Sequence, residues 1–420
     1  MPKLLIAYVA WSVAWHGFEF MLGRRQAAAI RAHRDTVPAA FAATVPLADH
    51  RKAAAYGLAR LRFGELAGLL DLAVGIVGLV WVLDLVSGLV SARMAPSIGR
   101  SLVILGIPWL AATLVGLPLA AWRDLVLEQR FGFNRKTPAL FIRDTMLSLL
   151  LTALIGGPLV AGILWAMRDL HGVGGVPWWL AVWAALTVAM LAAPTIYVRL
   201  VAPLFNRFTP LRPEVAEPVE ALLARAGFRS GGLFEMDASK RSSRGNAYFI
   251  GFGPTKRIVL FDTLLDAHPP EEIEAVVAHE LGHFKHRHTL FGIGRAVVGL
   301  FGTMAAIGWL SRQPWLLPGF GIRHADPAIG LLLAALVVSV ASPLLGLAGN
   351  AISRRHEFEA DAFARRAVGA GPMVSALTRL ARDNASTLTP DRLFSLVHDS
   401  HPPVPVRVAQ LLAARDPTPA

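Results

Sequence analysis

Residues 269–290 read PPEEIEAVVAHELGHFKHRHTL, and they contain an HExxH pattern at His279, Glu280 and His283. Two prolines suit the start of a helix, the acids that follow favour its positive end, and apolar residues recur along one face. We therefore expect a helix over this stretch. Residues four apart share a helix face, so both imidazoles can reach one metal ion.

Glu280 lies about a third of a turn away from the two histidines. It is too offset to bind the same ion with them, but it can hold and deprotonate a water molecule there. The chain has no cysteine, so any metal must be held by histidines and carboxylates. HExxH also arises by chance. A third ligand would distinguish a zinc site from a chance pattern, because catalytic zinc takes three protein ligands.

The composition indicates a membrane protein, because 54% of the residues are hydrophobic and only 17% are charged. Soluble chains contain about 45–50% apolar and about 25% charged residues. Seven stretches have the length and apolar character of a membrane span: 4–21, 66–91, 101–121, 146–167, 177–198, 291–311 and 327–349. The first has no small-residue cleavage site directly after it, so we expect it to be retained as a span.

Basic residues predict the orientation of the chain. They gather after spans 1 and 3, and few occupy the opposite loops. Because Lys and Arg favour the cytoplasmic side, seven spans place the N-terminus outside and the C-terminus in the cytoplasm. The net charge of +12 then fits contact with membrane lipid, and we expect no nucleic-acid partner.

Two regions follow from the span pattern. Residues 1–198 form an N-terminal membrane region with spans 1–5. Residues 199–420 form a second region, which we expect to be the metallopeptidase domain, and it includes spans 6 and 7 and the C-terminal cytoplasmic segment. Four acids fall inside or beside spans: Glu19, Glu65, Asp71 and Asp84. Since charge is costly against lipid, they either make polar contacts between helices or line a watery cavity.

Glu357 is the candidate third ligand. His283 lies eight residues before span 6, and Glu357 lies eight residues after span 7. If these spans form an antiparallel pair of helices that continue outward, both residues sit about 12 Å beyond the same membrane face. Helices packed about 8–10 Å apart can then share one ion.

Other polar residues near these positions leave alternatives open. Asp361 follows Glu357 by one helical turn and can accept the second ring N–H of a ligand histidine. Glu359 points elsewhere and is expected to be a surface acid. His286 and His288 are possible ligands on spacing, but both also read as basic residues at a membrane border.

At this point the chain resembles the type I CAAX prenyl protease family, whose members are integral-membrane zinc endopeptidases. The resemblance covers most of the chain. Its motifs are 128–134 (EQRFGFN), 202–211 (APLFNRFTPL), 239–243 (SKRSS), 246–249 (NAYF), 257–265 (RIVLFDTLL), 279–283 (HELGH), 357–361 (EFEAD) and 400–403 (SHPP).

The resemblance implies an all-α membrane protein with seven transmembrane helices in a barrel around a water-filled chamber, and a zincin-like domain on the cytoplasmic side. It implies one Zn²⁺ per chain. The implied roles are zinc ligands for His279, His283 and Glu357, catalytic base for Glu280, and contact with the substrate backbone or the developing oxyanion for Asn246, His401 and Arg407.

The last three residues also have plainer interpretations. Asn246 starts an alternating stretch, 246–250, which predicts a β-hairpin with 257–261 and a turn at 251–256. An edge strand there could bind an extended peptide, but Asn246 could equally be a turn residue. His401 could be a helix cap or a solvent-exposed histidine, and Arg407 a surface charge.

We therefore predict a membrane zinc metalloendopeptidase acting on a peptide or protein. CAAX-type C-terminal processing follows by resemblance, and quality control of membrane proteins is the alternative. A catalytically inactive scaffold of the same fold and a transporter with a chance HExxH are the other classes considered. The Gly- and Ala-rich, Arg-over-Lys composition looks bacterial, which suggests the inner membrane. The sequence does not predict an oligomeric state.

Overall fold

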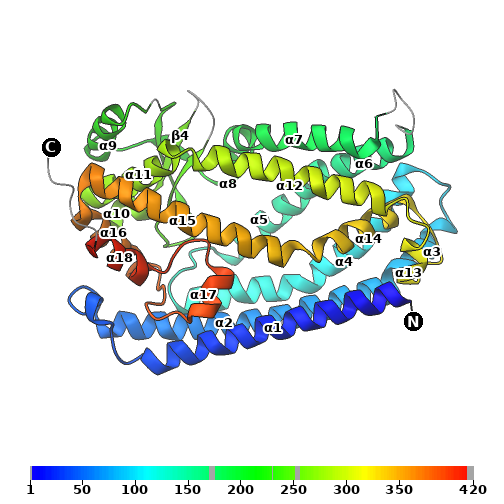
Figure 1. Cartoon of the computed structure of the whole chain (residues 1–420), viewed down its shortest axis with the longest axis horizontal. Coiled ribbons are helices and arrows are strands. Elements are labelled where there is room, and N and C mark those ends of the chain that lie inside the picture. Colours follow the sequence, from blue (N-terminus) through cyan, green and yellow to red (C-terminus); the bar gives the residue numbers. More distant parts are fainter. Residues whose placement is uncertain (1, 170–175, 229, 251–255, 414–420) are drawn as a thin grey trace.

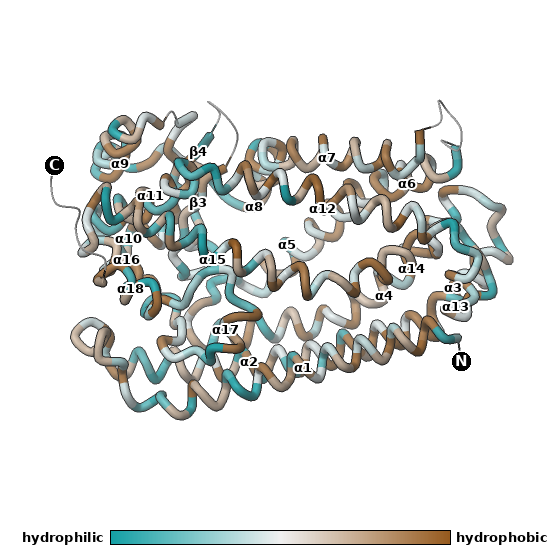
Figure 2. Tube along the Cα trace, in the orientation of Figure 1, coloured by the Kyte–Doolittle hydropathy of each residue, from teal (hydrophilic) through white to brown (hydrophobic). Residues whose placement is uncertain are grey.

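The computed structural model describes residues 2–169, 176–228, 230–250 and 256–413. Long helices run side by side along the molecule, and shorter helices with a small sheet gather at one end (Figure 1). Hydrophobic residues predominate along several of the long helices, whereas hydrophilic residues are more frequent at the end that carries the sheet (Figure 2). The molecule therefore combines a membrane part with a water-exposed part.

Six helical segments of the described chain are long and apolar enough to cross a membrane. They are α1 (Lys3–His33), α2 to α3 (Leu47–Ser91), α4 with the turn after it (Ile98–Glu128), α5 to α6 (Pro138–Asp169), α7 to α8 (Trp178–Phe205) and α12 (His288–Leu310). Helices α14 (Pro327–Ser339) and α15 (Ser342–Val368) form a seventh span if this pair, bent by 50°, is counted as one. All seven predicted spans fall on these helices.

Four of the spans contain a single π-helical turn, at Gly78–Val82, Arg123–Glu128, Thr152–Gly156 and Tyr197–Val201. Such a turn widens the helix by one residue and is accommodated by neighbouring packing. The spans are therefore longer and less regular than straight helices of minimal length.

A four-stranded sheet lies at the more hydrophilic end of the protein (Figure 2), with the strand order β1-β2-β4-β3. Its strands are β1 (Phe208–Pro210), β2 (Leu233–Met236), β3 (Ala247–Ile250) and β4 (Arg257–Phe261). Strands β3 and β4 pair antiparallel, while β2 and β4 pair parallel. The turn predicted at 251–256 lies outside the described residues except for Lys256. Within the described chain β3 is an edge strand, which leaves one side of its backbone open.

Two large hydrophobic cores contain most of the buried apolar side chains of the described chain. One lies under the sheet and includes fully buried residues of β4 and of α11 (Pro270–Lys285), such as Ile258, Ile273 and Leu281. The other lies among the membrane helices and includes Trp178 and Leu333. Helix α11 packs against α9 (Pro213–Arg225), α15 and α16 (Ala370–Asp383), so it is held on several sides.

The prediction of one continuous helix over 269–290 is wrong, because the helix is interrupted. Helix α11 ends at Lys285, α12 begins at His288, and Arg287 between them adopts a left-handed backbone with φ 58°. No proline or glycine marks the break. Helix α15, by contrast, continues without interruption from the membrane part into the sheet end (Figure 1).

Asp71 is exposed, and the other three acids in or beside the spans divide into two kinds. Asp84 makes polar contacts with the loop before α14, because its carboxylate accepts hydrogen bonds from the backbone N–H groups of Arg323 and His324. Glu19 and Glu65 instead line a cavity of about 1520 Å³ between α1 and α2. The cavity extends to segments near the sheet end, where Asn246 and His401 also line it.

Candidate active site

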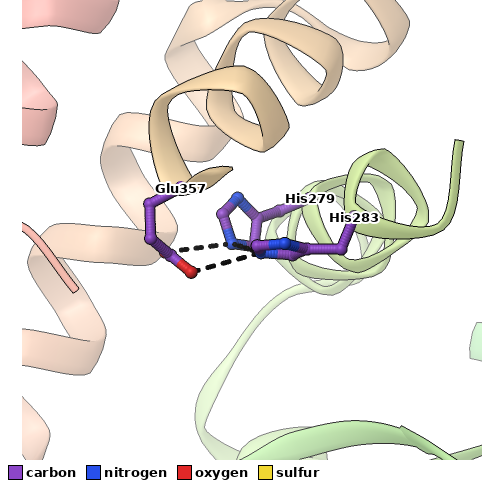
Figure 3. Close-up of side chains that lie close together, drawn as sticks. All are labelled: His279, His283 and Glu357. Carbon is purple, nitrogen blue, oxygen red and sulfur yellow. Dashed lines mark hydrogen bonds and ion pairs between the residues drawn. The ribbon is translucent and has the colours of Figure 1, made fainter. Parts of the chain in front are cut away.

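Three side chains from two helices converge at the end that carries the sheet. His279 and His283 project from one face of α11, and Glu357 projects toward them from α15 (Figure 3). His279 Nε2 lies 3.2 Å from His283 Nε2 and 3.4 Å from Glu357 Oε2, and His283 Nε2 lies 3.2 Å from Glu357 Oε1. The predicted meeting of Glu357 with the two histidines is therefore present in the structure.

A glycine allows the two helices to approach. A Cβ atom on Gly282 would lie 2.9 Å from the Ala360 Cα and 3.0 Å from the Ala360 carbonyl oxygen, both on the backbone of α15. Real Cβ atoms essentially never come so close, so a larger residue would push α11 and α15 apart. The close approach of α15 thus gives a steric reason for a glycine at position 282, directly before His283.

The three side chains fit a zinc ion. Zinc bonds imidazole nitrogen and carboxylate oxygen at about 2.0–2.2 Å, so tetrahedral ligand atoms lie about 3.3 Å apart. The observed separations of 3.2–3.4 Å agree with this spacing, with Glu357 presenting Oε2 to His279 and Oε1 to His283. Within the described chain, Glu357 Oε2 is also buried without a hydrogen-bond partner of good geometry. Arg407 Nη1 lies 3.3 Å from this oxygen, and a bound metal ion would give it a direct bonding partner as well.

Asp361 fixes the orientation of His279. Its Oδ1 lies 2.9 Å from His279 Nδ1, which leaves Nε2 for the ion. Burial acts to lower the pKa of His279, but hydrogen bonds to Asp361 and Glu357 outweigh burial and raise the pKa above its ordinary value. The same carboxylates that favour a proton on this ring would favour a bound cation.

Arg407 is buried, so the alternative that it is a surface charge is wrong. It lies on α18 (Val404–Ala413), where its guanidinium pairs with Asp361 and its Nη1 lies 3.3 Å from Glu357 Oε2. Burial acts to lower the pKa of Arg407, but the hydrogen bond to Asp361 outweighs it and raises the pKa above its ordinary value. Its positive charge therefore balances part of the negative charge of Glu357 and Asp361.

His401 lies at the open side of the site. Its side chain is 65% exposed, yet its Nδ1 lies 2.9 Å from Glu357 Oε2. It also lines the cavity described above. The ring therefore joins the ligand carboxylate to the space that a substrate would occupy.

Comparison with known proteins identifies the family. Residues 26–207 match the family described as CAAX prenyl protease N-terminal, five membrane helices, and residues 211–415 match peptidase family M48. The CAAX prenyl protease 1 homolog of Arabidopsis thaliana is 33% identical over 410 residues, which covers 95% of each chain. CAAX prenyl protease 1 of Saccharomyces cerevisiae is 31% identical over 437 residues, covering 97% of this chain and 95% of that one.

The fold agrees with this match. The crystal structure of S. mikatae Ste24p gives a TM-score of 0.89 at 29% identity, covering 98% of this chain and 99% of that one. The chain belongs to peptidase family M48. It is a membrane zinc metalloprotease of that family, as its sequence predicted.

Glu280, the predicted catalytic base of this M48 protease, lies next to His279 on α11. It is half-buried and follows His279 directly on α11, so it stands beside the ligand face and not on it. Its charge also acts on the guanidinium of Arg407. Its predicted role does not depend on further rearrangement of α11.

Asn246 stands directly before the edge strand β3 in the M48 fold. It is exposed, its backbone oxygen accepts a hydrogen bond from Phe261, and its side chain accepts one from the N–H of Ala247. The segment before it is anchored because Arg244 forms an ion pair of 2.9 Å with Glu128, part of the EQRFGFN motif. Asn246 therefore lies at the cavity wall on a fixed backbone.

The sequence predicted other roles for two residues near these side chains, His288 and Glu359. His288 lies behind His283, with the two Nδ1 atoms 3.1 Å apart, and its Nε2 lies 2.9 Å from Glu359 Oε2. Glu359 is therefore paired and not an isolated surface acid of α15. No spacing rule could find this link, because it depends on the break at Arg287.

Proposed function

We propose that this M48 protease cleaves peptide bonds near the C-terminus of CAAX-type substrates, with one zinc ion per chain held by His279, His283 and Glu357. The observation that carries the metal assignment is the set of ligand separations of 3.2–3.4 Å. The substrate class rests on the curated relatives of Arabidopsis thaliana and Saccharomyces cerevisiae, which bear the name CAAX prenyl protease 1.

When bound, zinc would supply Lewis-acid chemistry that polarises the peptide carbonyl. Glu280 accepts a proton from the water that attacks the carbonyl carbon, and it delivers this proton to the amine that leaves as the C–N bond breaks. Asp361 holds His279 in one tautomer, and Arg407 holds Asp361. His401, exposed beside Glu357, donates from its other ring nitrogen to the carbonyl oxygen as negative charge develops there.

The substrate would bind as an added strand along β3. An edge strand offers unpaired backbone groups to an extended peptide, and Asn246 at its start can contact the peptide backbone. The cavity between α1 and α2 adjoins this strand and His401, and it would hold water and the rest of the substrate. Its volume of about 1520 Å³ exceeds that of ordinary ligand pockets, which reach about 1,000 Å³.

The active site would face the cytoplasm. Helix α1 begins at the end of the molecule away from the site (Figure 1). Seven crossings, with α14 and α15 counted as one bent span, would then bring α15 to the site. The basic residues after spans 1 and 3 favour the cytoplasm for the site's end of these helices. Together with the composition, this supports an inner-membrane protein of a bacterium with its N-terminus outside.

The test compares a farnesylated CAAX peptide with the same peptide lacking the farnesyl group. Purified wild-type protein in detergent should cleave the farnesylated peptide faster, as measured by mass spectrometry. Glu280→Gln should retain zinc and lose turnover, whereas Glu274→Gln, elsewhere on α11, should retain both. Equal or faster cleavage of the unmodified peptide would contradict CAAX processing and favour quality control of membrane proteins. Full activity of Glu280→Gln would remove Glu280 from the mechanism.

A further inference from the structure

A second group of metal-binding side chains lies directly behind the first. One nitrogen of His286, one of His288 and one carboxylate oxygen of Glu359 all lie within 4.8 Å of one another. His288 is buried, Glu359 is half-buried and His286 is exposed. The group is thus open to solvent on one side and anchored on the other.

The break between α11 and α12 creates this group. Arg287 has φ 58°, a left-handed conformation that residues with a side chain rarely adopt. It turns the chain so that the rings of His286 and His288 stack, with centroids 5.5 Å apart and planes 15° apart. In an unbroken helix, residues two apart point to different sides. Backbone strain of this kind persists where surrounding structure enforces it.

Helix α15 supplies the remaining contacts. Glu359 Oε2 lies 2.9 Å from His288 Nε2, while its Oε1 accepts a hydrogen bond of 3.2 Å from Arg355 Nε. The side chain of Arg355 is 82% exposed, so this ion pair is weak and a bound cation can displace it. The ring of His356 stacks flat on His288 at 3.9 Å and fixes its plane.

We propose that His286, His288 and Glu359 form a second divalent-cation site, for a zinc-like ion, and that its occupation inhibits the protease. Two imidazoles and one carboxylate are a ligand set that zinc favours, whereas magnesium and calcium require oxygen ligands. The solvent-exposed side leaves a position for water.

The inhibition follows from the contact between His288 and His283, and this part rests on the proposed function. If His283 holds the catalytic ion through Nε2, its Nδ1 carries a proton and donates to His288 Nδ1, 3.1 Å away. His288 then carries its own proton on Nε2, facing Glu359. A cation bound to His288 Nε2 displaces that proton. The ring stays neutral by carrying one proton on Nδ1 instead. Two N–H groups then face each other, which weakens the hold on His283.

The site is tested by equilibrium dialysis of the detergent-solubilised protein against buffered Zn²⁺, with metal analysis. The wild type should bind a second zinc ion that His286→Ala and Glu359→Gln lose, while both variants keep the first ion and the same melting temperature. His33→Ala, another exposed histidine near a helix end, should keep both ions. A single ion in the wild type, or two ions in His286→Ala, would overturn the proposed second site.

Activity separates inhibition from binding. Excess zinc should inhibit the wild type, and His286→Ala should resist it while its activity at low zinc is unchanged. Equal inhibition of wild type and His286→Ala would place the inhibitory ion at the catalytic centre and overturn the coupling. A chelator could instead remove the ion at His279, His283 and Glu357 while the ion at His286, His288 and Glu359 stays bound. That result would contradict the proposed set of catalytic ligands.

Discussion

Arg407 and Asp361 form a buried two-point ion pair, with Nε 2.8 Å from Oδ2 and Nη2 2.5 Å from Oδ1. The two side chains are only 9% and 5% exposed. Asp361 also contacts His279, so one carboxylate connects a metal-binding ring to an arginine 46 residues further along the chain. We therefore predict that Arg407 positions His279 through Asp361, besides any contact it makes with substrate.

Replacing Arg407 should therefore affect metal binding and stability. Arg407→Ala removes the arginine partner of the buried Asp361, and breaking a buried ion pair typically costs about 3–5 kcal/mol. Loss of an outer partner of a metal ligand typically weakens metal binding about 10–100-fold. Arg407→Lys keeps the charge without the planar fork and should lie between wild type and Arg407→Ala.

The measurements for Arg407 are the melting temperature and the zinc affinity in competition with a chelator. Arg366→Ala, an exposed arginine on the same helix as Asp361, is the control and should change neither. If Arg407→Ala matched the wild type in both, the ion pair would have no positioning role.

Gly282→Ala should separate the two ligand-bearing helices. The added methyl group meets backbone atoms of Ala360 at 2.9 and 3.0 Å, and backbone cannot move aside as a side-chain end can. Overpacking of this kind costs about 1–3 kcal/mol, and the ligand separations should widen with it. We expect reduced zinc content and a lower melting temperature.

Gly294→Ala on α12 is the matched control for Gly282→Ala. A Cβ atom at Gly294 meets nothing within 4 Å, so zinc content and melting temperature should stay unchanged. Wild-type zinc content in Gly282→Ala would show that α11 and α15 can separate without disturbing the site.

The meeting of His279, His283 and Glu357 could be predicted from sequence because it depends on regular helix spacing. His279 and His283 share a helix face through their spacing of four, and Glu357 was located by its equal distance from the paired spans. The structure places all three within 3.4 Å of one another. The equal-distance argument assumed that α11 and α12 are one helix, but the break at Arg287 did not displace His283 from Glu357.

Contacts between distant segments could not be predicted. Arg407 was open to interpretation as a surface charge because its partner, Asp361, lies on another helix. Strands β1 and β2 are short, and β2 pairs in parallel with a strand that is distant in sequence, so no local pattern marks them. The π-helical turns also leave no residue signature, because they arise from packing of the finished helix bundle.

Stability should fall in acid through a buried network at the start of α11. Glu272 is 2% exposed and lies within hydrogen-bond distance of His268, Ser375 and Arg379. Burial raises the pKa of Glu272, but the hydrogen bonds from Ser375 and Arg379 outweigh burial and hold the pKa below its usual 4.5. Burial also lowers the pKa of His268 below its usual 6.5, more than its hydrogen bond to Glu272 raises it.

Both shifts have the same sign for stability. The unfolded chain binds protons at these two groups more tightly than the folded protein does, so acid favours unfolding. The contribution of His268 is complete above its usual pKa of 6.5, and that of Glu272 above its usual pKa of 4.5. Each is lost as the pH falls below that value toward the folded pKa.

The measurement is the melting temperature of metal-free protein between pH 7 and pH 4, because zinc binding has a pH dependence of its own. Glu272→Gln should be less stable than the wild type at pH 7, and its melting temperature should fall less steeply below pH 5. Glu271→Gln, an exposed acid in the same helical turn, is the control. If the melting temperatures of the wild type and Glu272→Gln fell in parallel as the pH is lowered, the hydrogen-bond network around Glu272 would be excluded as the acid-sensitive element.

Reporter fusions should place the two ends of the chain on opposite sides of the membrane. The seven crossings are odd in number if the bent pair α14 and α15 counts as one span. We expect a fusion before residue 2 to report outside and a fusion after residue 413 to report the cytoplasm. Both reporters on the same side would mean that the bent pair enters and leaves the membrane on one face.

His401→Ala should reduce turnover more than it reduces metal binding. The ring touches Glu357 Oε2 at 2.9 Å, but it is 65% exposed, so its removal leaves no cavity in the core. The metal keeps three ligands from α11 and α15, and zinc content and melting temperature should match the wild type. The carbonyl oxygen of the substrate loses one donor at the moment when negative charge develops on it. Removing such a donor typically lowers kcat by about 10²–10³, with a smaller change in KM.

His398→Ala is the matched control for His401→Ala. His398 lies on the same segment and lines the same cavity, but its ring pairs with Glu19, 3.1 Å away, on α1. Its replacement should therefore change kcat far less. Zinc content, melting temperature, kcat and KM should be measured for both variants on one peptide. Loss of zinc in His401→Ala would make His401 a metal ligand, and wild-type kcat with normal zinc would return it to an ordinary solvent-exposed histidine. A rise in KM alone would assign it to substrate binding, because an interaction equally strong in the bound substrate and in the transition state leaves kcat unchanged.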